Sequence, residues 1–432
     1  MTKKANLPTR RKLLRGGAIG SALLAAAWLR PSNNGGAHSD YFLRLQGALR
    51  EAGLHRPTLV LDAQRLKQNT DRLMHHIGSK FAYRIVGKSL PSLPLIQSVR
   101  NQTGTNRVMV FHQPFLNLIA KEMPDSQLLM GKPMPVLAAK RFYSFHTNRE
   151  FNPATQLQWL IDSQERLQEY SELAAGLNQR MLIVLELDVG LHRGGFRASD
   201  EVGLAIMSLK QDPNLQFAGF MGYEAHASKM PKVIGGPIQA LGKAMKFYGQ
   251  CVSVAQNILG DEFKPQHLTL NAGGSSTYQM YTSNHPCNEL ATGSALVKPS
   301  DFDGPYLQDH IPAAFIATPV IKALDHTEVP GLENLSGLMP LLNPNSERSF
   351  FTYGGYWKAN PESPPGLSNN ALYGRSTNQE MLNGSRKVKL KRDDFVFLRP
   401  TQSEFVFLQF GDIAVFDGHH ISSLWPVFQQ GA

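Results

Sequence analysis

Short apolar segments alternate with amphipathic helical patterns over most of the chain, and this alternation restricts the possible folds more than any other feature. In one such pattern, 164–178, four apolar side chains from Leu167 to Leu177 share a single stripe. Repeated strand–helix units of this size predict a parallel sheet, and eight of them can close into a barrel. Nine strands are expected, so one lies outside the barrel, and we expect it to be the first. The nine are 58–62, 81–86, 107–111, 127–130, 156–161, 181–188, 215–222, 266–271 and 290–297.

The composition changes after about residue 300, where segments rich in Pro, Gly and Asn separate short apolar runs. Such runs between turn residues suit short strands. The sequence therefore predicts an α/β protein, with a (β/α)8 TIM-type barrel over 38–300 followed by a smaller C-terminal β-rich domain over 301–432. The strands expected in the second domain are 387–390, 394–398, 405–410 and 413–416.

Residues 1–37 resemble an export signal of the twin-arginine type followed by a linker. Arg10 and Arg11 form the arginine pair, an apolar stretch rich in Ala and Gly covers 18–29, and small residues at 25–27 suit a cleavage site. The stretch is short for a membrane span, although an uncleaved membrane anchor is the alternative. We therefore expect a periplasmic protein that meets the membrane only during export.

The net charge of +10 is concentrated at the N-terminus of the 432-residue chain. Seven Lys or Arg residues and no acidic residue lie within 1–30, which leaves about +3 for the rest. That small excess gives no indication of a nucleic-acid partner. Cys251 and Cys287 allow at most one disulfide, so neither a disulfide scaffold nor a thiolate metal site is indicated.

Two of the expected strands end in a cation. Lys88 follows 81–86 directly, and a lysine at the end of a buried strand can be desolvated, which leaves a free amine able to form a Schiff base with an aldehyde. The alternative is a solvated lysine that opens a loop. Arg193 lies in the Gly-rich turn after 181–188, where it is suited to binding a phenolate, carboxylate or phosphate.

Two further strand ends carry polar or Gly-rich segments. Tyr223 and His226 follow 215–222, although a single His is often only a hydrogen-bonded core residue. Gly273, Gly274, Ser275 and Ser276 follow 266–271, and exposed backbone N–H groups in such a run make a phosphate cradle, although many such runs are simple turns. Together, a strand-end Lys, a strand-end Arg and this cradle predict a barrel that binds pyridoxal 5'-phosphate.

The order and context of these motifs resemble the barrel-type (fold type III) pyridoxal-phosphate enzymes. The resemblance is to their D-threonine aldolase and D-serine dehydratase branch in particular, with alanine racemase a more distant relative, and it covers about 57–426. In chain order, the matching motifs are Thr58-Leu-Val-Leu-Asp62 with Asn69, Arg84-x-x-x-Lys88, Asp188-x-Gly-x-x-Arg193-x-Gly195, Gly222-Tyr223 with His226, Gly273 to Tyr278, Asn288-Glu289 with Gly293 and 301–303, and Asp412 to Gly418 with Trp425-Pro426.

The resemblance implies roles for individual residues. Lys88 would carry the cofactor as an internal aldimine and then act as the base at the substrate Cα, while the cofactor supplies the electron sink. Family members are often dimers, so a homodimer is expected by resemblance alone. The residues that would bind the cofactor are Lys88, Arg193, Tyr223, His226, Gly273, Gly274, Ser275 and Ser276.

The chain departs from the branch at its metal site. Gln402 and Glu404 stand where the branch has a metal-binding His-x-Cys or His-x-Asp. An amide and a carboxylate offer only oxygen, which suits Mn²⁺, Mg²⁺ or Ca²⁺ rather than zinc. The alternative, which we favour, is that these two side chains hydrogen-bond the substrate or each other without a metal.

The sequence therefore predicts a pyridoxal-phosphate-dependent lyase that acts on a small, D-configured β-hydroxy amino acid. The reaction would be aldol cleavage or dehydration through the Lys88 aldimine. Racemisation from the same carbanion is one alternative, although the racemase Arg that faces the pyridine nitrogen falls near Ala291 here, and the second domain shows no racemase-like tyrosine base. A non-catalytic barrel that binds the cofactor or another ligand is the other alternative.

Overall fold

The computed structural model describes residues 30–328, 331, 343–370 and 372–429, so the expected signal at 1–29 lies outside the described residues. The chain forms two compact units. The barrel unit comprises 58–315 and the chain from 399 onward, and the sheet unit comprises the described residues before 58 together with 316–398. Within the described ranges, no helix has both the length and the hydropathy that crossing a membrane requires.

Eight parallel strands, β2 to β9, close a barrel in the barrel unit, which confirms the predicted fold class. The ring closes where β2 pairs with β9, so that Ala82 lies opposite Glu289. The first strand, β1 (Thr58–Asp62), lies outside the ring as predicted and pairs in parallel with β16 (Ile413–Phe416). The barrel strands are β2 (Ala82–Val86), β3 (Arg107–Val110), β4 (Gln127–Met130), β5 (Leu157–Ile161), β6 (Met181–Leu187), β7 (Leu215–Gly222), β8 (Thr269–Ala272) and β9 (Glu289–Thr292).

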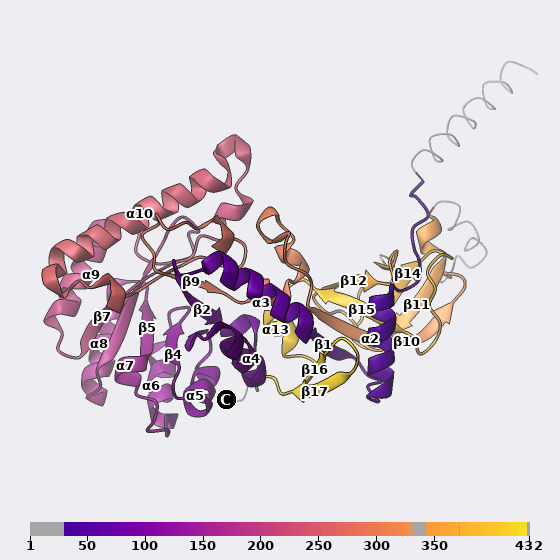
Figure 1. The fold of residues 1–432 in the computed structure, drawn as a ribbon, viewed down its shortest axis with the longest axis horizontal. Helices are drawn as coiled ribbons and strands as arrows, with labels where there is room; N and C mark the ends of the chain where they lie inside the picture. The colour runs from indigo at the N-terminus through magenta and orange to yellow at the C-terminus, as the bar shows by residue number, and fades with distance from the viewer. Residues whose placement is uncertain (1–29, 329–330, 332–342, 371, 430–432) are drawn as a thin grey trace, which may run out of the picture. The chain divides into compact units, whose positions relative to one another are not determined.

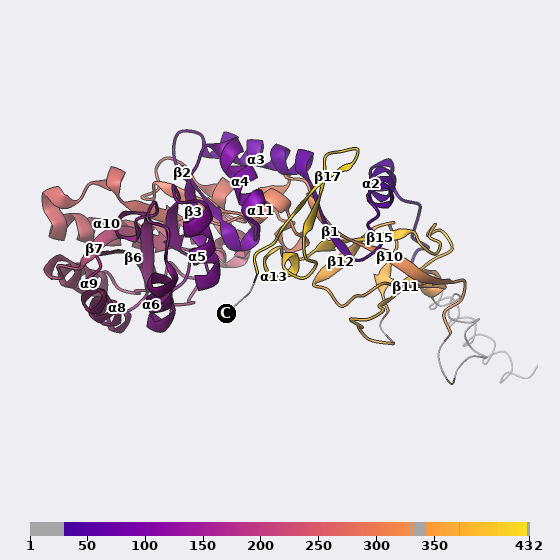
Figure 2. The same ribbon diagram turned by 90° about the horizontal axis from the view of Figure 1, so that it is seen from below.

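Helices cover the outside of these strands, the arrangement of a TIM barrel (Figures 1 and 2). The predicted helix at 164–178 is typical. The hydroxyl of Ser163 caps its start by accepting from the Arg166 N–H, and Asn178 ends it in the left-handed conformation with φ 48°. Three of its four stripe residues are buried, namely Leu167, Tyr170 and Leu173. The helices are α3 (Ala63–Ile77), α4 (Leu93–Thr103), α5 (Gln113–Glu122), α6 (Val136–Phe145), α7 (Pro153–Gln156), α8 (Gln164–Leu177), α9 (Ser199–Gln211), α10 (Gly236–Leu259) and α11 (Ser294–Val297).

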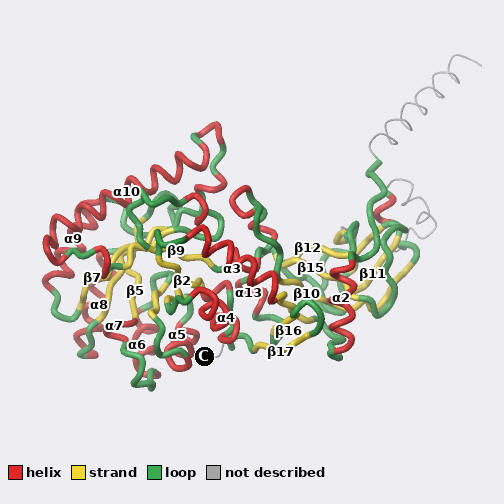
Figure 3. The backbone as a smooth tube through the Cα atoms, in the orientation of Figure 1, coloured by secondary structure: helices red, strands yellow, loops and turns green. Residues whose placement is uncertain are grey.

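The sheet unit is an antiparallel sheet with one helix, α2 (Asp40–Glu51). Its strands follow the order β13–β14–β11–β10–β15–β12, and Figure 3 shows them in yellow. The amide oxygen of Gln46 on α2 accepts a 2.8 Å hydrogen bond from the Phe395 N–H, which ties the helix to the sheet. The strands are β10 (Ala314–Leu324), β11 (Arg348–Thr352), β12 (Ala359–Ser363), β13 (Ser368–Asn369), β14 (Met381–Gly384) and β15 (Phe395–Pro400).

Three predicted strands differ from the structure. The segment 387–390 is a loop, because the Lys389 N–H bonds to the Gly36 carbonyl rather than to a neighbouring strand. The run 405–410 contains the short helix α13 (Glu404–Phe407), which a short apolar run cannot distinguish from a strand. The strand expected over 290–297 ends at Thr292, where α11 soon begins. The predictions at 394–398 and 413–416 are found as β15 and β16, the latter paired with β17 (Ile421–Trp425).

Candidate active site

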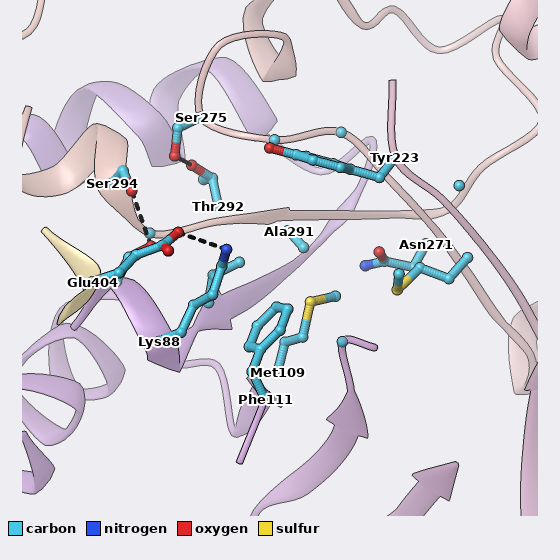
Figure 4. Close-up of a pocket in the computed structure, with 18 of the residues that line it drawn as sticks. Lys88, Met109, Phe111, Tyr223, Asn271, Ser275, Ala291, Thr292, Ser294 and Glu404 are labelled. Atoms are coloured by element: carbon cyan, nitrogen blue, oxygen red, sulfur yellow. Dashed lines mark hydrogen bonds and ion pairs between the residues drawn. The ribbon is translucent and has the colours of Figure 1, made fainter. Parts of the chain in front are cut away.

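The carboxyl ends of the barrel strands surround a cavity (Figure 4). Its walls come from the ends of β2, β3, β7, β8 and β9, from the turn after β6, and from Phe302 and Glu404. Active sites of TIM barrels lie at this face. The structure therefore brings together residues that the sequence places far apart, including Lys88, Arg193 and Tyr223.

Lys88 lies in one turn of 3₁₀ helix, Gly87–Ser89, directly after β2. Its Nζ lies 2.6 Å from Oε1 of Glu404, the first residue of α13, and 4.8 Å from the centre of the Phe111 ring. The two paired side chains are 36% and 42% exposed. The structure thus differs from the expected desolvated amine, because the ammonium is partly exposed and neutralised by a carboxylate.

Arg193 and Tyr223 form a second wall. The Arg193 guanidinium carbon lies 5.1 Å from the centre of the Tyr223 ring, in a cation–π contact. Burial raises the pKa of the Tyr223 hydroxyl, and the nearby Glu224 carboxylate adds to the effect. The same ring packs against Gly274, where a Cβ would lie only 2.6 Å from Tyr223 Cε2. A glycine is therefore needed at 274.

The segment after β8 approaches the end of β9. The Ser275 hydroxyl lies 2.6 Å from the Thr292 hydroxyl and accepts a hydrogen bond from the Ala295 N–H at 3.0 Å. The N–H groups of Gly274 and Ser275, by contrast, donate to no acceptor within the described part of the chain. Unpaired backbone donors beside a cavity form a site for an anion such as a phosphate.

A buried carboxylate supports this segment from behind. Glu224 is fully buried and accepts from the Gly273 N–H at 3.3 Å and from the Thr277 hydroxyl at 2.6 Å. Burial raises its pKa, and these hydrogen bonds only partly oppose the effect. The contacts fix both ends of the Gly273–Thr277 turn.

Two predicted site residues lie elsewhere. His226 caps a 3₁₀ turn, Ala227–Lys229, and lines a separate cavity with Asp188 and Gly190. Ser276 lines a third cavity beside 301–307. Neither side chain belongs to the cavity that holds Lys88, because the chain turns away from that cavity at both positions.

At the two positions where the branch binds a metal, the described side chains do not form a ready ligand set. The Glu404 carboxylate is paired with the Lys88 ammonium, and Gln402 supplies only an amide. Among the described residues, no group of three or more His, Cys, Asp or Glu side chains is placed to hold a metal.

Asn271 and Thr292 also line the cavity, and neither was predicted from the sequence. Both lie at strand ends, and Asn271 is the last residue of the predicted strand 266–271. The rule that located Lys88 at a strand end would therefore have found Asn271 as well. Its amide matters because it lies in a wall that is otherwise apolar, between Met109, Met221 and Ala291.

The residues present fit pyridoxal phosphate. Lys88 offers an amine for the aldehyde, Gly274 and Ser275 offer free N–H groups for the phosphate, and Arg193 offers a guanidinium for the phenolate.

The barrel fold and a site that fits pyridoxal phosphate together define a class of protein, and the family comparison agrees with this assignment. The family model "Alanine racemase, N-terminal domain" matches residues 61–301, more than half of the chain, and the chain belongs to this family. No curated protein matches the chain in sequence.

Solved structures share the fold at low sequence identity. D-threonine aldolase from Filomicrobium marinum has a TM-score of 0.67 at 15% identity, over 86% of this chain and 94% of that one. D-threo-3-hydroxyaspartate dehydratase from Delftia sp. HT23 has a TM-score of 0.64 at 14% identity, over 87% of this chain and 98% of that one. Alanine racemase from Bacillus anthracis has a TM-score of 0.63 at 14% identity, over 86% of this chain and 98% of that one. These similarities confirm the resemblance to the fold type III enzymes.

Proposed function

We propose that this protein is a pyridoxal-phosphate-dependent enzyme that acts on a small amino acid. The carrying observation is the position of Lys88, whose amine enters the same cavity as the unpaired N–H groups of Gly274 and Ser275. An amine and an anion cradle in one cavity match the aldehyde and the phosphate of this cofactor. The family membership supports the proposal.

The cofactor, when bound, would supply the electron sink that makes the substrate Cα acidic. The side chains of the protein would transfer protons and bind the charged groups. In dehydration or racemisation, Lys88 Nζ would take the Cα proton as general base; in aldol cleavage, Cα gains a proton instead. The Glu404 carboxylate, 2.6 Å from Nζ, would hold the resulting ammonium. Arg193 would bind an anionic oxygen, and the apolar side chains of Met109 and Phe111 line the cavity near Lys88.

The reaction that we propose is aldol cleavage or dehydration of a D-configured β-hydroxy amino acid. Aldol cleavage breaks the Cα–Cβ bond: the β-hydroxyl loses its proton, an aldehyde leaves, and Cα gains a proton to give the amino-acid product. Dehydration removes the Cα proton and the β-hydroxyl as water, and the product hydrolyses to a 2-oxo acid and ammonia. The similarity to a D-threonine aldolase and to a D-threo-3-hydroxyaspartate dehydratase supports this class.

Racemisation is the second candidate reaction, and the side chains at the metal positions, Gln402 and Glu404, favour it. Because the His-x-Cys or His-x-Asp ligands of the branch are replaced by Gln402 and Glu404, and Glu404 contacts Lys88, a reaction that needs no activation of a β-hydroxyl suits these side chains. The similarity to alanine racemases points the same way. A racemase would remove the proton from one face of Cα and add a proton to the other, and Lys88 would supply one of the two groups that this exchange requires.

The test begins with the visible absorbance of the purified protein during titration with pyridoxal phosphate. We expect a bound-cofactor band that is absent in Lys88→Ala. Addition of D-threonine, D-serine and D-alanine, with their L-enantiomers as controls, should then perturb the band. Aldehyde, 2-oxo acid or the enantiomer identifies the reaction. A band that no amino acid perturbs would leave a cofactor-binding barrel without turnover.

We also propose that the protein is exported to the periplasm. The arginine pair Arg10–Arg11 and the apolar stretch at 18–29 support this. In cell fractionation, the wild-type protein should appear in the periplasm, whereas replacement of both arginines by lysine should retain it in the cytoplasm. Equal periplasmic amounts of the two proteins would contradict the proposal.

A further inference from the structure

Asn271 presents a free acceptor to the cavity. The residue lies in β8, is only 1% exposed, and lines the cavity that contains Lys88. Its Nδ2 donates a 2.8 Å hydrogen bond to Oε1 of Glu289. Its Oδ1, by contrast, accepts no hydrogen bond from any described residue and is not among the fully enclosed unpaired atoms, so it faces the cavity. Figure 4 shows the Asn271 amide in the cavity wall across from Lys88.

The orientation of this amide is set by a buried ion network. Glu289 is fully buried and accepts from Arg84 Nε at 2.5 Å and from Arg107 Nη1 at 2.7 Å. Burial alone would raise the Glu289 pKa, but the two guanidinium groups outweigh it and hold the pKa below its usual range. A carboxylate can only accept hydrogen bonds. The amide NH₂ must therefore face Glu289, which leaves Oδ1 for the cavity.

The network is rigid because its members span several strands. Arg84 on β2 also donates to the carbonyls of Val108 on β3, at 3.3 Å, and of Gln127 on β4, at 2.8 Å. Reversing the Asn271 amide would bring two acceptor oxygens together in a buried site, which is strongly unfavourable.

The wall around Asn271 is neutral. The charged side chains among the described cavity residues are Lys88, Arg193 and Glu404. The adjacent strand β9 contributes Ala291 and Thr292 to the cavity lining, and neither side chain is charged. A ligand donor that reaches this wall therefore meets Oδ1 of Asn271.

We propose that Asn271 Oδ1 accepts a hydrogen bond from the protonated ring nitrogen of pyridoxal phosphate. This inference rests on the proposed function. In the cofactor, the aldehyde carbon is attached opposite the ring nitrogen, so a ring bonded to Lys88 turns its nitrogen toward the wall opposite that lysine. Asn271 binds the nitrogen there, and Glu289, Arg84 and Arg107 are positioning residues that fix its orientation. A neutral acceptor backed by an ionised carboxylate thus favours the protonated ring.

The test uses the full-length protein with pyridoxal phosphate labelled with ¹⁵N at the ring nitrogen. We expect the wild-type ¹⁵N signal at the position of a protonated, hydrogen-bonded pyridine. In Asn271→Leu the signal should move toward that of an unprotonated ring, and the cofactor dissociation constant should rise roughly tenfold or more, the loss typical of one hydrogen bond to a charged group. Met109→Leu, which alters the same cavity without touching a polar group, should leave the ¹⁵N signal unchanged.

Asn271→Ser, a smaller replacement, serves if Asn271→Leu does not fold as judged by circular dichroism, and it should shift the signal in the same direction. An unprotonated ring in the wild type, or identical ¹⁵N signals in the wild type and the Asn271 variant, would overturn the inference while leaving the proposed function intact. Failure of the wild type to bind the cofactor at all would overturn both. These results separate the two proposals.

Discussion

At the scale of single residues, Glu404 is the side chain whose role the sequence left most open. The structure pairs it with Lys88 at 2.6 Å, with both groups more than a third exposed. Such pairs contribute little to folding, at most about 1 kcal/mol. Their effect on a reacting group is a separate matter, because the same carboxylate stabilises Lys88 whenever Nζ carries a proton.

For Glu404→Gln we therefore expect the melting temperature to change little. Turnover should fall roughly fivefold, the equivalent of about 1 kcal/mol lost from a partly exposed pair. The measurements are thermal unfolding and kcat on the best amino-acid substrate, with Lys88→Ala as the inactive reference. Unchanged turnover would show that the carboxylate does not support the lysine during the reaction.

A second residue-scale prediction concerns Glu186 on β6. Burial raises its pKa to about 7, and the neighbouring Asp162 carboxylate acts in the same direction. The folded state therefore holds the proton more tightly than the unfolded state does. The stabilisation that comes from protonated Glu186 is complete below the pKa that this carboxyl has in the unfolded chain. It is lost as the pH rises toward 7.

The free energy of unfolding should accordingly decline between about pH 4.5 and pH 7 because of this group. Glu186→Gln keeps the shape without the charge, so its decline should be smaller over the same range. Urea unfolding at several pH values measures both curves. Parallel curves would contradict the assignment.

At the scale of elements, the end of β9 must approach the turn that carries Lys88. A Cβ at Gly293 would lie 2.6 Å from the Val86 carbonyl oxygen and 3.0 Å from Ser89 Cβ. Gly293→Ala would push the Lys88 turn away, with a stability cost of about 1–3 kcal/mol and a loss of cofactor affinity.

The matched control is Gly242 in α10, where an added Cβ meets no atom within 4 Å. Gly242→Ala should be stabilising by about 0.5–1 kcal/mol, because alanine favours a helix, and cofactor binding should be unchanged. Unfolding curves and cofactor titrations of the two variants provide the comparison. Equal behaviour of the two variants would show that the close approach of β9 is not needed.

Elements also show what the sequence could predict. The strands from β1 to β8 lie within three residues of their expected positions, because each is a short apolar run between helical patterns. Periodicity failed at 405–410, where the helix α13 places Glu404 beside Lys88. Strand-end positions indicated Lys88 and Arg193 but not which way a side chain turns, so His226 lines a different cavity from Lys88 and Asn271 was not predicted.

At the scale of the whole molecule, both units are built from separate segments of the chain. The barrel unit is interrupted by 316–398, which belongs to the sheet unit. Inside the sheet unit, β10 and β15 are antiparallel partners, and Ile316 lies opposite Leu398. The chain therefore leaves the barrel unit and returns to it at neighbouring points. Cα atoms paired across antiparallel strands are roughly 5 Å apart.

This topology makes the barrel unit separable by design. A shortened protein would start at Thr58 and join Phe315 to Arg399 through two or three glycines, which are long enough to bridge paired strands. Every residue that lines the cavity lies in the retained segments, including Glu404 from the C-terminal one. We therefore expect the shortened protein to fold and to bind pyridoxal phosphate.

Circular dichroism and the visible absorbance of the bound cofactor test this expectation. The same shortened protein with Lys88→Ala is the control, and it should fold without developing the band. A folded barrel that does not bind the cofactor would show that the sheet unit contributes to the site. Failure to fold would instead show that the barrel unit depends on the sheet unit for its stability. Retention of the band would establish that the cofactor site is complete within 58–315 and the chain from 399 onward.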